Sequence, residues 1–327
     1  MRPLAFISVL SLSLLTAALP ASTSTSDLNP LPLVIWHGLG DDYTRGGLKE
    51  IAALAESTNP GTYVHIIHIG DSASSDREAT FLGNVTEQVS TVCTQLADDP
   101  ILSTAPAVNA IGFSQGGQFL RAYVERCNSP PIRNLVTIGS QHNGIAAFQE
   151  CSFGDIICLG AEAILKFGRW SSFVQSRFVP AQYFRDPSDL DAYLENSNFL
   201  ADANNERAVK NASYKQNLGT LNRLAMYMFR DDTIVHPKES AWFAEVDVAS
   251  GVVTPLRERA IYKEDWLGLK GLDEKGALEF GTLSGDHMQL DEGDMVDVFQ
   301  KYFGPVEIDA SLDQKEALVD QEVLGDL

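Results

Sequence analysis

Positive charge is scarce in this sequence of 327 residues. It contains 24 lysine and arginine residues against 44 aspartate and glutamate residues, which gives a formal net charge of -20 at pH 7. A nucleic acid is a polyanion and would be repelled by such a chain, and no basic stripe in the sequence offsets the repulsion. The composition therefore argues against nucleic acid as a partner.

Long apolar runs are also lacking. The apolar run near the N-terminus falls short of the about 18 residues that a membrane-spanning helix needs. It follows Arg2 and ends in a small-residue segment at 19–21, so residues 1–21 have the three parts of a secretory signal peptide, with cleavage near Ala21 or Ala18. We expect a protein of the secretory pathway without stable membrane insertion.

Cysteine is rare, with four in the whole chain. In an oxidising compartment an even number favours disulfides over metal ligation or a reactive thiol. Three pairings are possible for Cys93, Cys127, Cys151 and Cys158. The close spacing of Cys151 and Cys158 suggests a local pair, which leaves Cys93 for Cys127.

Two N-glycosylation sequons agree with a secretory route. They begin at Asn84 and Asn211, and each would be an acceptor if exposed. A sequon is short enough to arise by chance, so each alone is weak support.

Strand patterns and helix patterns alternate along most of the chain. Strands are predicted at 33–36, 63–69, 107–113, 132–138 and 224–229, and helices at 48–55, 81–96, 118–124, near 237 and at 292–302. The alternation implies βαβ crossovers and a mostly parallel sheet covered on both faces. Aromatic residues interrupt it from about 144 to 214, where we expect a helical insertion over the sheet. We predict one α/β domain over 28–305 and a solvated acidic tail over 306–327.

The sharpest local signal is the segment Gly112-Phe113-Ser114-Gln115-Gly116. It follows a predicted strand and precedes a predicted helix, which is the context of the nucleophile elbow in an α/β-hydrolase fold. In that turn the glycines allow a cramped backbone and the serine oxygen is held above the sheet. We therefore predict Ser114 as a nucleophile, the alternative being a tight glycine turn without a catalytic role.

A serine hydroxyl needs a base to take its proton, and the base is oriented by a carboxylate. In this fold the order along the chain is serine, acid, histidine. Of the three histidines after Ser114, His142 comes too early and His236 lies in the same turn as Asp232. His287 remains, in a loop before the last helix, and we predict it as the base.

The acid and the oxyanion donors are less well defined. The strand over 224–229 is followed by Asp231 and Asp232, and periodicity cannot choose between them. One oxyanion donor is the backbone N–H after the nucleophile, that of Gln115, and the other belongs to an early loop, where Leu39 is the natural candidate. We expect His37 to shape that loop rather than to take part in chemistry.

No metal or other cofactor is predicted. His65 and His68 are three positions apart in a predicted strand, so their side chains face opposite sides of the sheet. The sequence shows no other cluster with credible spacing for metal ligands.

Several longer stretches of sequence are informative beyond these single motifs. In chain order they are LPLVIWHGLGDD, IGFSQGGQFLRAYVERC, GSQHNG, AQYFRDP, FLADANNERAVKNASYKQNL, DDTIVHPKESAWF and LSGDHMQL. Through these blocks the chain resembles the palmitoyl-protein thioesterases of the lysosome over roughly residues 30 to 304. Several blocks in one order are far more specific than the elbow alone.

The resemblance implies roles for particular residues. It implies a catalytic triad of Ser114, Asp232 and His287, with Asp232 chosen because it aligns with the family's aspartate. It implies the same two oxyanion donors as above, and the disulfides Cys93–Cys127 and Cys151–Cys158.

Three departures from the family pattern stand out. Asp42 and Tyr43 stand where family members carry an additional cysteine pair, His236 stands where the family often has aspartate, and the tail over 306–327 has no counterpart. None of them touches the implied triad.

The resemblance also implies an activity. It is the removal of long-chain acyl groups such as palmitate from S-acylated cysteines of proteins or peptides, through a serine acyl-enzyme. The helical insertion would line an acyl-binding groove, and the protein would reach a lysosome or vacuole, or the outside of the cell. The rival functions are a secreted carboxyl esterase or lipase, and a non-catalytic lipid-binding protein on the same scaffold.

Overall fold

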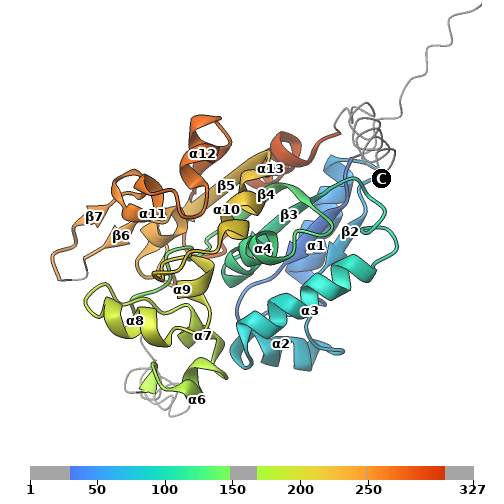
Figure 1. Ribbon diagram of the computed structural model, residues 1–327. Helices are drawn as coiled ribbons and strands as arrows, with labels where there is room; N and C mark the ends of the chain where they lie inside the picture. The colour runs from blue at the N-terminus through green and yellow to red at the C-terminus, as the bar shows by residue number, and fades with distance from the viewer. Residues whose placement is uncertain (1–29, 148–167, 248, 306–327) are drawn as a thin grey trace, which may run out of the picture.

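The central feature of the computed structural model, which describes residues 30–147, 168–247 and 249–305, is a six-stranded sheet (Figure 1). The strand order is β2-β1-β3-β4-β5-β8, and every neighbouring pair is parallel. The bounds are β1 Leu33–Trp36, β2 Val64–Ile66, β3 Val108–Phe113, β4 Ile132–Ile138, β5 Arg223–Phe229 and β8 Leu278–Leu283.

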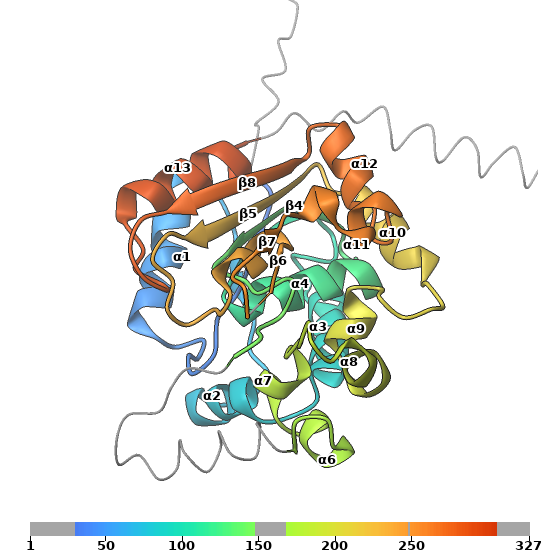
Figure 2. The same cartoon turned by 90° about the vertical axis from the view of Figure 1, so that its left-hand side faces the viewer.

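Helices cover both faces of this sheet (Figure 2). Helices α1 (Gly46–Thr58) and α13 (Glu292–Phe303) pack together on one face, and α3 (Val85–Asp98), α4 (Gln115–Arg126) and α10 (Ala212–Gly219) lie on the other. Alternate residues of β1 serve the two layers: Leu33 and Ile35 join the core under α1 and α13, while Val34 and Trp36 join the core under α3 and α4. A continuous apolar strand is what a sheet buried on both sides requires.

This arrangement is the α/β-hydrolase fold, and the predicted fold class is confirmed. Each crossover helix buries an apolar stripe against the sheet, and the strands end together at one edge. The loops at that edge follow the carboxyl ends of β1, β3, β5 and β8, which is where the predicted site residues stand.

The predicted helix over 81–96 is wrong in its first turn. Phe81 ends a separate helix, α2 (Ala73–Phe81), and Gly83 follows with φ 125°, a backbone region that favours glycine. Helix α3 begins at Val85 because the Asn84 side chain accepts a hydrogen bond of 3.0 Å from the Thr86 N–H. An asparagine N-cap of this kind separates two helices that apolar spacing alone would merge.

The insertion between β4 and β5 is helical where the structure describes it. Its helices are α6 (Ser172–Gln175), α7 (Val179–Gln182), α8 (Leu190–Asn196), α9 (Leu200–Ala203) and α10. Trp170 packs against Phe184 and Tyr193 with ring centroids 6.1 Å apart in each pair, and Phe199 meets Phe119 of α4 at 5.6 Å. Phe199 therefore ties the insertion to α4, while Trp170 packs within the insertion itself, so these aromatic residues do not serve only to line a groove.

The segment between β5 and α13 contains elements that the sequence did not predict. Edge strand β8 has a mixed burial pattern and so lacks clear alternation. The remaining elements are the 3-10 helices η1 (Lys238–Trp242) and η2 (Leu256–Glu258), the antiparallel strands β6 (Glu245–Val246) and β7 (Val253–Thr254), and helices α11 (Ala260–Lys263) and α12 (Leu269–Glu274). Helix η1 corresponds to the short helix predicted near Pro237.

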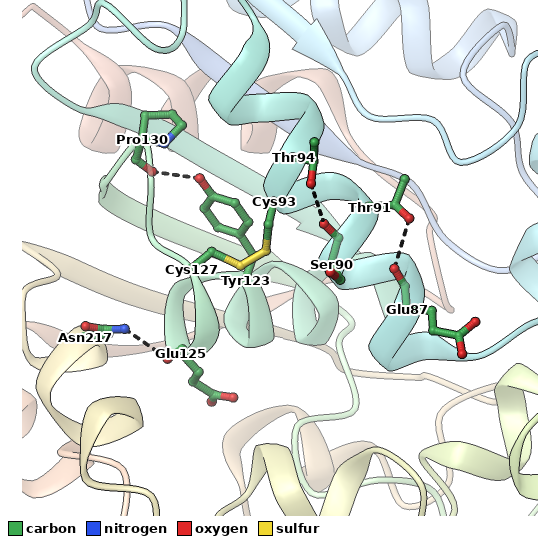
Figure 3. Close-up of a disulfide and its surroundings, with 10 residues drawn as sticks. All are labelled: Glu87, Ser90, Thr91, Cys93, Thr94, Tyr123, Glu125, Cys127, Pro130 and Asn217. Carbon is green, nitrogen blue, oxygen red and sulfur yellow. Dashed lines mark hydrogen bonds between the residues drawn. A yellow bond between two sulfur atoms is a disulfide. The ribbon is translucent and has the colours of Figure 1, made fainter.

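A disulfide joins two helices of one layer (Figure 3). It links Cys93 of α3 to Cys127, the residue directly after α4, across a sequence separation of 34. In the chain-entropy account a closed loop of that length contributes about 3–4 kcal/mol to stability. Cys151 and Cys158 lie outside the described residues, so their pairing stays a prediction.

The N-terminal and C-terminal segments, residues 1–29 and 306–327, also lie outside the described residues. The signal peptide and the acidic tail stay predictions for that reason. Within the part that is described, none of the helices combines the length and the apolar character needed to cross a membrane.

Candidate active site

Ser114 lies in a sharp turn between β3 and α4. Its backbone has φ 51° and ψ -126°, a conformation that costs energy for a residue with a side chain. The flanking glycines are required: a Cβ on Gly112 would lie 2.3 Å from the Gly117 Cα, and one on Gly116 would lie 2.3 Å from the Trp36 carbonyl oxygen. The turn therefore has the geometry of a nucleophile elbow.

Two further predicted residues meet Ser114 at the same edge of the sheet. His287 Nε2 lies 3.0 Å from Ser114 Oγ, and His287 Nδ1 lies 2.8 Å from Asp232 Oδ2. Ser114 follows β3, Asp232 follows β5 and His287 follows β8, so the carboxyl ends of these parallel strands bring together residues far apart in the sequence. The resulting chain of hydrogen bonds runs from a hydroxyl through an imidazole to a carboxylate.

Asp232, rather than Asp231, faces the histidine. Its side chain is 1% exposed, and its other carboxylate oxygen accepts hydrogen bonds from the N–H groups of Ile234 at 2.9 Å and Val235 at 2.8 Å. These bonds fix the orientation of the carboxylate and compensate its burial. Asp231 is exposed, and its backbone N–H donates to the Gly285 carbonyl at 3.1 Å.

Asp286 is a residue that sequence reasoning missed. Its Oδ1 accepts hydrogen bonds from the Thr233 N–H at 2.8 Å and from the His287 N–H at 2.7 Å. These hydrogen bonds lower the pKa of the Asp286 carboxyl from its usual value. Asp286 thus ties the histidine loop to the turn that carries Asp232, and its place directly before His287 was the only signal in the sequence.

The loop over 37–40 comes very close to Ser114. A Cβ on Gly38 would lie 3.0 Å from the Ser114 Cβ, so glycine lets this backbone approach the serine. Leu39, in the same loop, lines the cavity at Ser114 and is 40% exposed. Gln115 begins helix α4, and the first N–H groups of a helix have no acceptor within it. The two predicted oxyanion donors therefore belong to segments that flank the serine.

A network of buried side chains connects these two segments to the insertion. The Gly40 N–H donates to Thr80 Oγ1 at 2.9 Å, and Gln115 Nε2 donates to the Thr80 carbonyl at 3.2 Å. The Tyr183 hydroxyl donates to Gln115 Oε1 at 3.1 Å. Thr80 of α2 therefore holds the early loop and the start of α4 at the same time.

His37 is structural, as expected. Its Nε2 lies 2.9 Å from Asp76 Oδ2, and both residues are buried. Burial of the ring opposes protonation, but the hydrogen bond and the charge of Asp76 outweigh it, and the pKa of His37 is raised above its ordinary 6.5. Asp76 also accepts hydrogen bonds of 2.9 Å from the Tyr43 N–H and 2.7 Å from the Ile69 N–H, so one carboxylate joins three segments.

An ion pair occupies the position where the resemblance expects a cysteine pair. Asp42 is 2% exposed and accepts hydrogen bonds from Thr44 Oγ1 at 2.6 Å and from Arg77 Nη2 at 2.8 Å. The bonds from Thr44 and Arg77 lower the pKa of Asp42 to about 2. The pair ties the loop after β1 to helix α2 without a disulfide.

The other histidines do not join the site. His142 is buried against Phe243, with its Nε2 2.9 Å from Thr137 Oγ1 and its Nδ1 accepting a hydrogen bond of 3.2 Å from Arg121. Burial and the charge of Arg121 lower its pKa well below the ordinary value. His65 pairs with Asp99 at 3.5 Å. Among the residues that the structure describes, no group of His, Cys, Asp and Glu could hold a metal ion.

The two sequon asparagines both cap helices. Asn84 precedes α3 and is half-buried, and Asn211 precedes α10 and is exposed. Asn211 Oδ1 accepts the Ser213 N–H at 3.1 Å. Glycosylation at either position stays a prediction.

Ser114 and His287 open into a large cavity of about 1530 Å³. From the insertion and α2 it is lined by Phe81, Ile145, Ala147, Pro180 and Tyr183. Most of the lining surface is apolar, which suits an alkyl chain.

A nucleophile elbow, an imidazole and a carboxylate at the carboxyl ends of parallel strands define an α/β-hydrolase of the serine type. The family model described as Palmitoyl protein thioesterase matches residues 32–287, and the chain belongs to that family.

Known relatives agree with this membership. The chain is 41% identical to Palmitoyl-protein thioesterase 1 of Caenorhabditis elegans over 279 residues, which cover 84% of this chain and 92% of the relative. It is 37% identical to the palmitoyl-protein thioesterase-dolichyl pyrophosphate phosphatase fusion 1 of Schizosaccharomyces pombe, over 84% of this chain and 43% of that protein. It is 30% identical to the lysosomal thioesterase PPT2 homolog of Drosophila melanogaster, over 82% of this chain and 89% of that protein.

Proposed function

We propose that this protein is a thioesterase that removes palmitate and similar long acyl groups from S-acylated cysteines of proteins or peptides. The observation that carries the proposal is the hydrogen-bonded series Ser114, His287 and Asp232 at the mouth of an apolar cavity. Membership of the palmitoyl protein thioesterase family supports the thioester as the bond that is cleaved.

In the first half of the reaction His287 takes the proton of Ser114 as the serine oxygen attacks the thioester carbonyl. The carbonyl oxygen becomes an oxyanion, and the N–H groups of Leu39 and Gln115 are the donors assigned to it. The C–S bond then breaks, and His287 gives its proton to the departing cysteine thiolate. Asp232 keeps the imidazole in the right orientation and stabilises its protonated form.

The second half releases the fatty acid. His287 takes a proton from water, the hydroxide attacks the acyl-serine carbonyl, and Ser114 leaves with the proton returned by His287.

The apolar lining of the cavity explains why a long chain would be preferred. Burial of one CH₂ group contributes about 0.8 kcal/mol, so a sixteen-carbon chain could contribute up to roughly 10 kcal/mol. Phe81, Ile145 and Pro180 are placed to supply the apolar contacts. A short acyl group would lose most of this binding energy.

The test compares an S-palmitoyl peptide with an oxygen ester of the same acyl length, for wild type and Ser114→Ala. We expect wild type to favour the thioester and Ser114→Ala to lose at least about 10³-fold in kcat. Equal or faster cleavage of the oxygen ester would indicate a general esterase. Binding of the palmitoyl peptide without turnover of either ester would indicate a lipid-binding protein.

We further propose that the protein enters the secretory pathway and is delivered to a lysosome or vacuole, or secreted. The Drosophila relative is named as lysosomal, and residues 1–21 have the pattern of a signal peptide. The cavity residues bind acyl thioesters in this proposal, and the partners are the acylated proteins themselves.

A further inference from the structure

The cavity at Ser114 is larger than an acyl chain needs. Its volume of about 1530 Å³ exceeds the roughly 300–1,000 Å³ of pockets that hold one small molecule. One part lies among α2 and the insertion, as described above. Another part runs between α1 and the start of α13, two helices that pack together on the opposite face of the sheet (Figure 2).

We call this second part the α1–α13 groove. It is lined by Gly47, Glu50, Ile51, Leu54, Asp291 and Glu292. Lining residues on α1 extend from Gly46 to Ser57, a distance of roughly 16 Å at about 1.5 Å per residue. The α1 wall of the groove is therefore long enough for several residues of an extended peptide, while its α13 wall ends at Met295.

The groove is acidic at its rim and apolar along its floor. Glu50, Asp291 and Glu292 are exposed, while Ile51 and Leu54 are half-buried. The one cation among the lining residues that the structure describes is Arg45, which already pairs with Asp41 at 3.1 Å. No salt bridge within the described part of the chain engages Glu50 or Glu292.

We propose that the α1–α13 groove binds the peptide around the acylated cysteine and selects lysine or arginine beside it. Lysine and arginine fit both features, because their alkyl stems can cover Ile51 and Leu54 while their charged ends meet Glu50 and Glu292. A leaving group that carries phosphates is repelled by the same rim. This inference rests on the proposed function, since it assigns the leaving-group side of that reaction.

The first experiment uses three S-palmitoyl peptides that differ only in the residues flanking the cysteine: two lysines, two alanines or two glutamates. At pH 7 and low salt we expect kcat/KM to fall by about tenfold from the lysine to the glutamate peptide, mainly through KM. The preference should shrink at roughly 0.5 M salt, because exposed charges are then screened. Palmitoyl-coenzyme A should behave like the glutamate peptide or worse.

The second experiment assigns the preference to the groove. The double variant Glu50→Gln and Glu292→Gln should bring the ratio between the lysine and glutamate peptides close to one. Glu56→Gln is the matched control, since Glu56 is an exposed residue of α1 that does not line the cavity. The control should keep the wild-type ratio.

The third experiment separates the peptide from the acyl chain. A Cβ on Gly47 meets nothing within 4 Å, so Gly47→Trp can fill the groove without backbone strain. It should raise KM for the palmitoyl peptide at least fivefold and leave KM for S-palmitoyl cysteamine unchanged. Gly271→Trp is the control, because Gly271 is a helical glycine with equally open surroundings away from the cavity.

The outcomes distinguish this inference from the proposed function. Hydrolysis of all three peptides at equal rates would overturn the charge preference and leave the thioesterase function intact. A Gly47→Trp variant that impairs both palmitoyl substrates would place the acyl chain in the groove instead, and so would overturn the assignment. If wild type hydrolyses no thioester at all, the proposed function fails and this inference fails with it.

Discussion

At the scale of single residues, the buried pair of His37 and Asp76 determines the shape of the loop beside Ser114. Burial opposes the charge on each partner, but their mutual hydrogen bond outweighs it: the pKa of His37 is raised above 6.5, and the pKa of Asp76 is lowered below 3.8. A raised histidine pKa stabilises the fold at pH values below the raised value. A lowered aspartate pKa stabilises it at pH values above the lowered value. The pair is therefore fully charged, and most stabilising, between about pH 4 and 6.5.

We predict that Asp76→Asn destabilises the protein most in this acidic window. At pH 5 the substitution leaves a buried imidazolium without its partner and should lower the free energy of unfolding by about 3–5 kcal/mol. At pH 9 His37 is neutral, only hydrogen bonds are lost, and the effect should fall to about 1–3 kcal/mol. Urea unfolding at both pH values measures the difference, with the exposed Asp71→Asn as control. An equal loss at both pH values would contradict the charged pair.

Single residues also show where sequence reasoning reaches its limit. The elbow around Ser114 could be predicted because local chemistry, two glycines and a strand-to-helix switch, specifies it. Asp231 and Asp232 could not be separated without the resemblance, because only the backbone N–H groups of the following turn reveal which carboxylate points inward. Asp286 was missed because its partner Thr233 lies 53 positions earlier, a distance over which spacing carries no information.

At the scale of elements, helix α2 links the early loop to the start of α4. The side chain of Thr80 accepts the Gly40 N–H, and its carbonyl accepts Gln115 Nε2. One threonine therefore bonds to the residue after Leu39 and to the side chain of Gln115, and Leu39 and Gln115 are the candidate oxyanion donors. A helix that the apolar pattern did not reveal is therefore the element that positions the site. The pattern missed it because most of its residues are polar and its start is marked by a serine capping box rather than by an apolar stripe.

Thr80→Val should impair the chemical step more than substrate binding. The substitution keeps the shape of the side chain and removes the acceptor of the Gly40 N–H. We expect kcat to fall roughly tenfold, less than the 10²–10³ that loss of an oxyanion donor itself costs. KM for a palmitoyl peptide should stay within about twofold.

Thr80→Ser serves as the rescue variant, because it restores the hydroxyl. It should return kcat close to wild type even though it loses a methyl group. Equal kcat values for the valine and serine variants would show that packing, not the hydrogen bond, positions the loop. Thermal unfolding of both variants separates a positioning effect from a loss of folded protein.

At the scale of the whole molecule, the parallel sheet with its covering helices could be predicted from the sequence. The edge strand β8 and the short elements after β5 could not. The buried strand β1 is a continuous apolar run, and β4 is buried along most of its length although it contains Arg133, Asn134 and Thr137. The alternation of such strands with helices fixes the parallel sheet. Strand β8 completes the sheet but lies at its edge, where partial exposure removes the apolar signal. The short elements after β5 depend on tertiary contacts and have no periodic pattern of their own.

The overall charge of the protein predicts how its thermal stability responds to salt. A formal net charge of -20 at pH 7 destabilises a compact fold through self-repulsion. At pH 5 more ionisable side chains carry a proton than at pH 7, which makes the net charge less negative. Raising sodium chloride from about 0.02 to 0.5 M should therefore raise Tm by roughly 2–5 °C at pH 7. At pH 5 the rise in Tm should be less than half as large, because there is less repulsion between like charges for the salt to screen. Sucrose, which acts without screening, should stabilise the protein equally at both pH values. A salt effect of the same size at both pH values would mean that local ion pairs, rather than net charge, govern the response.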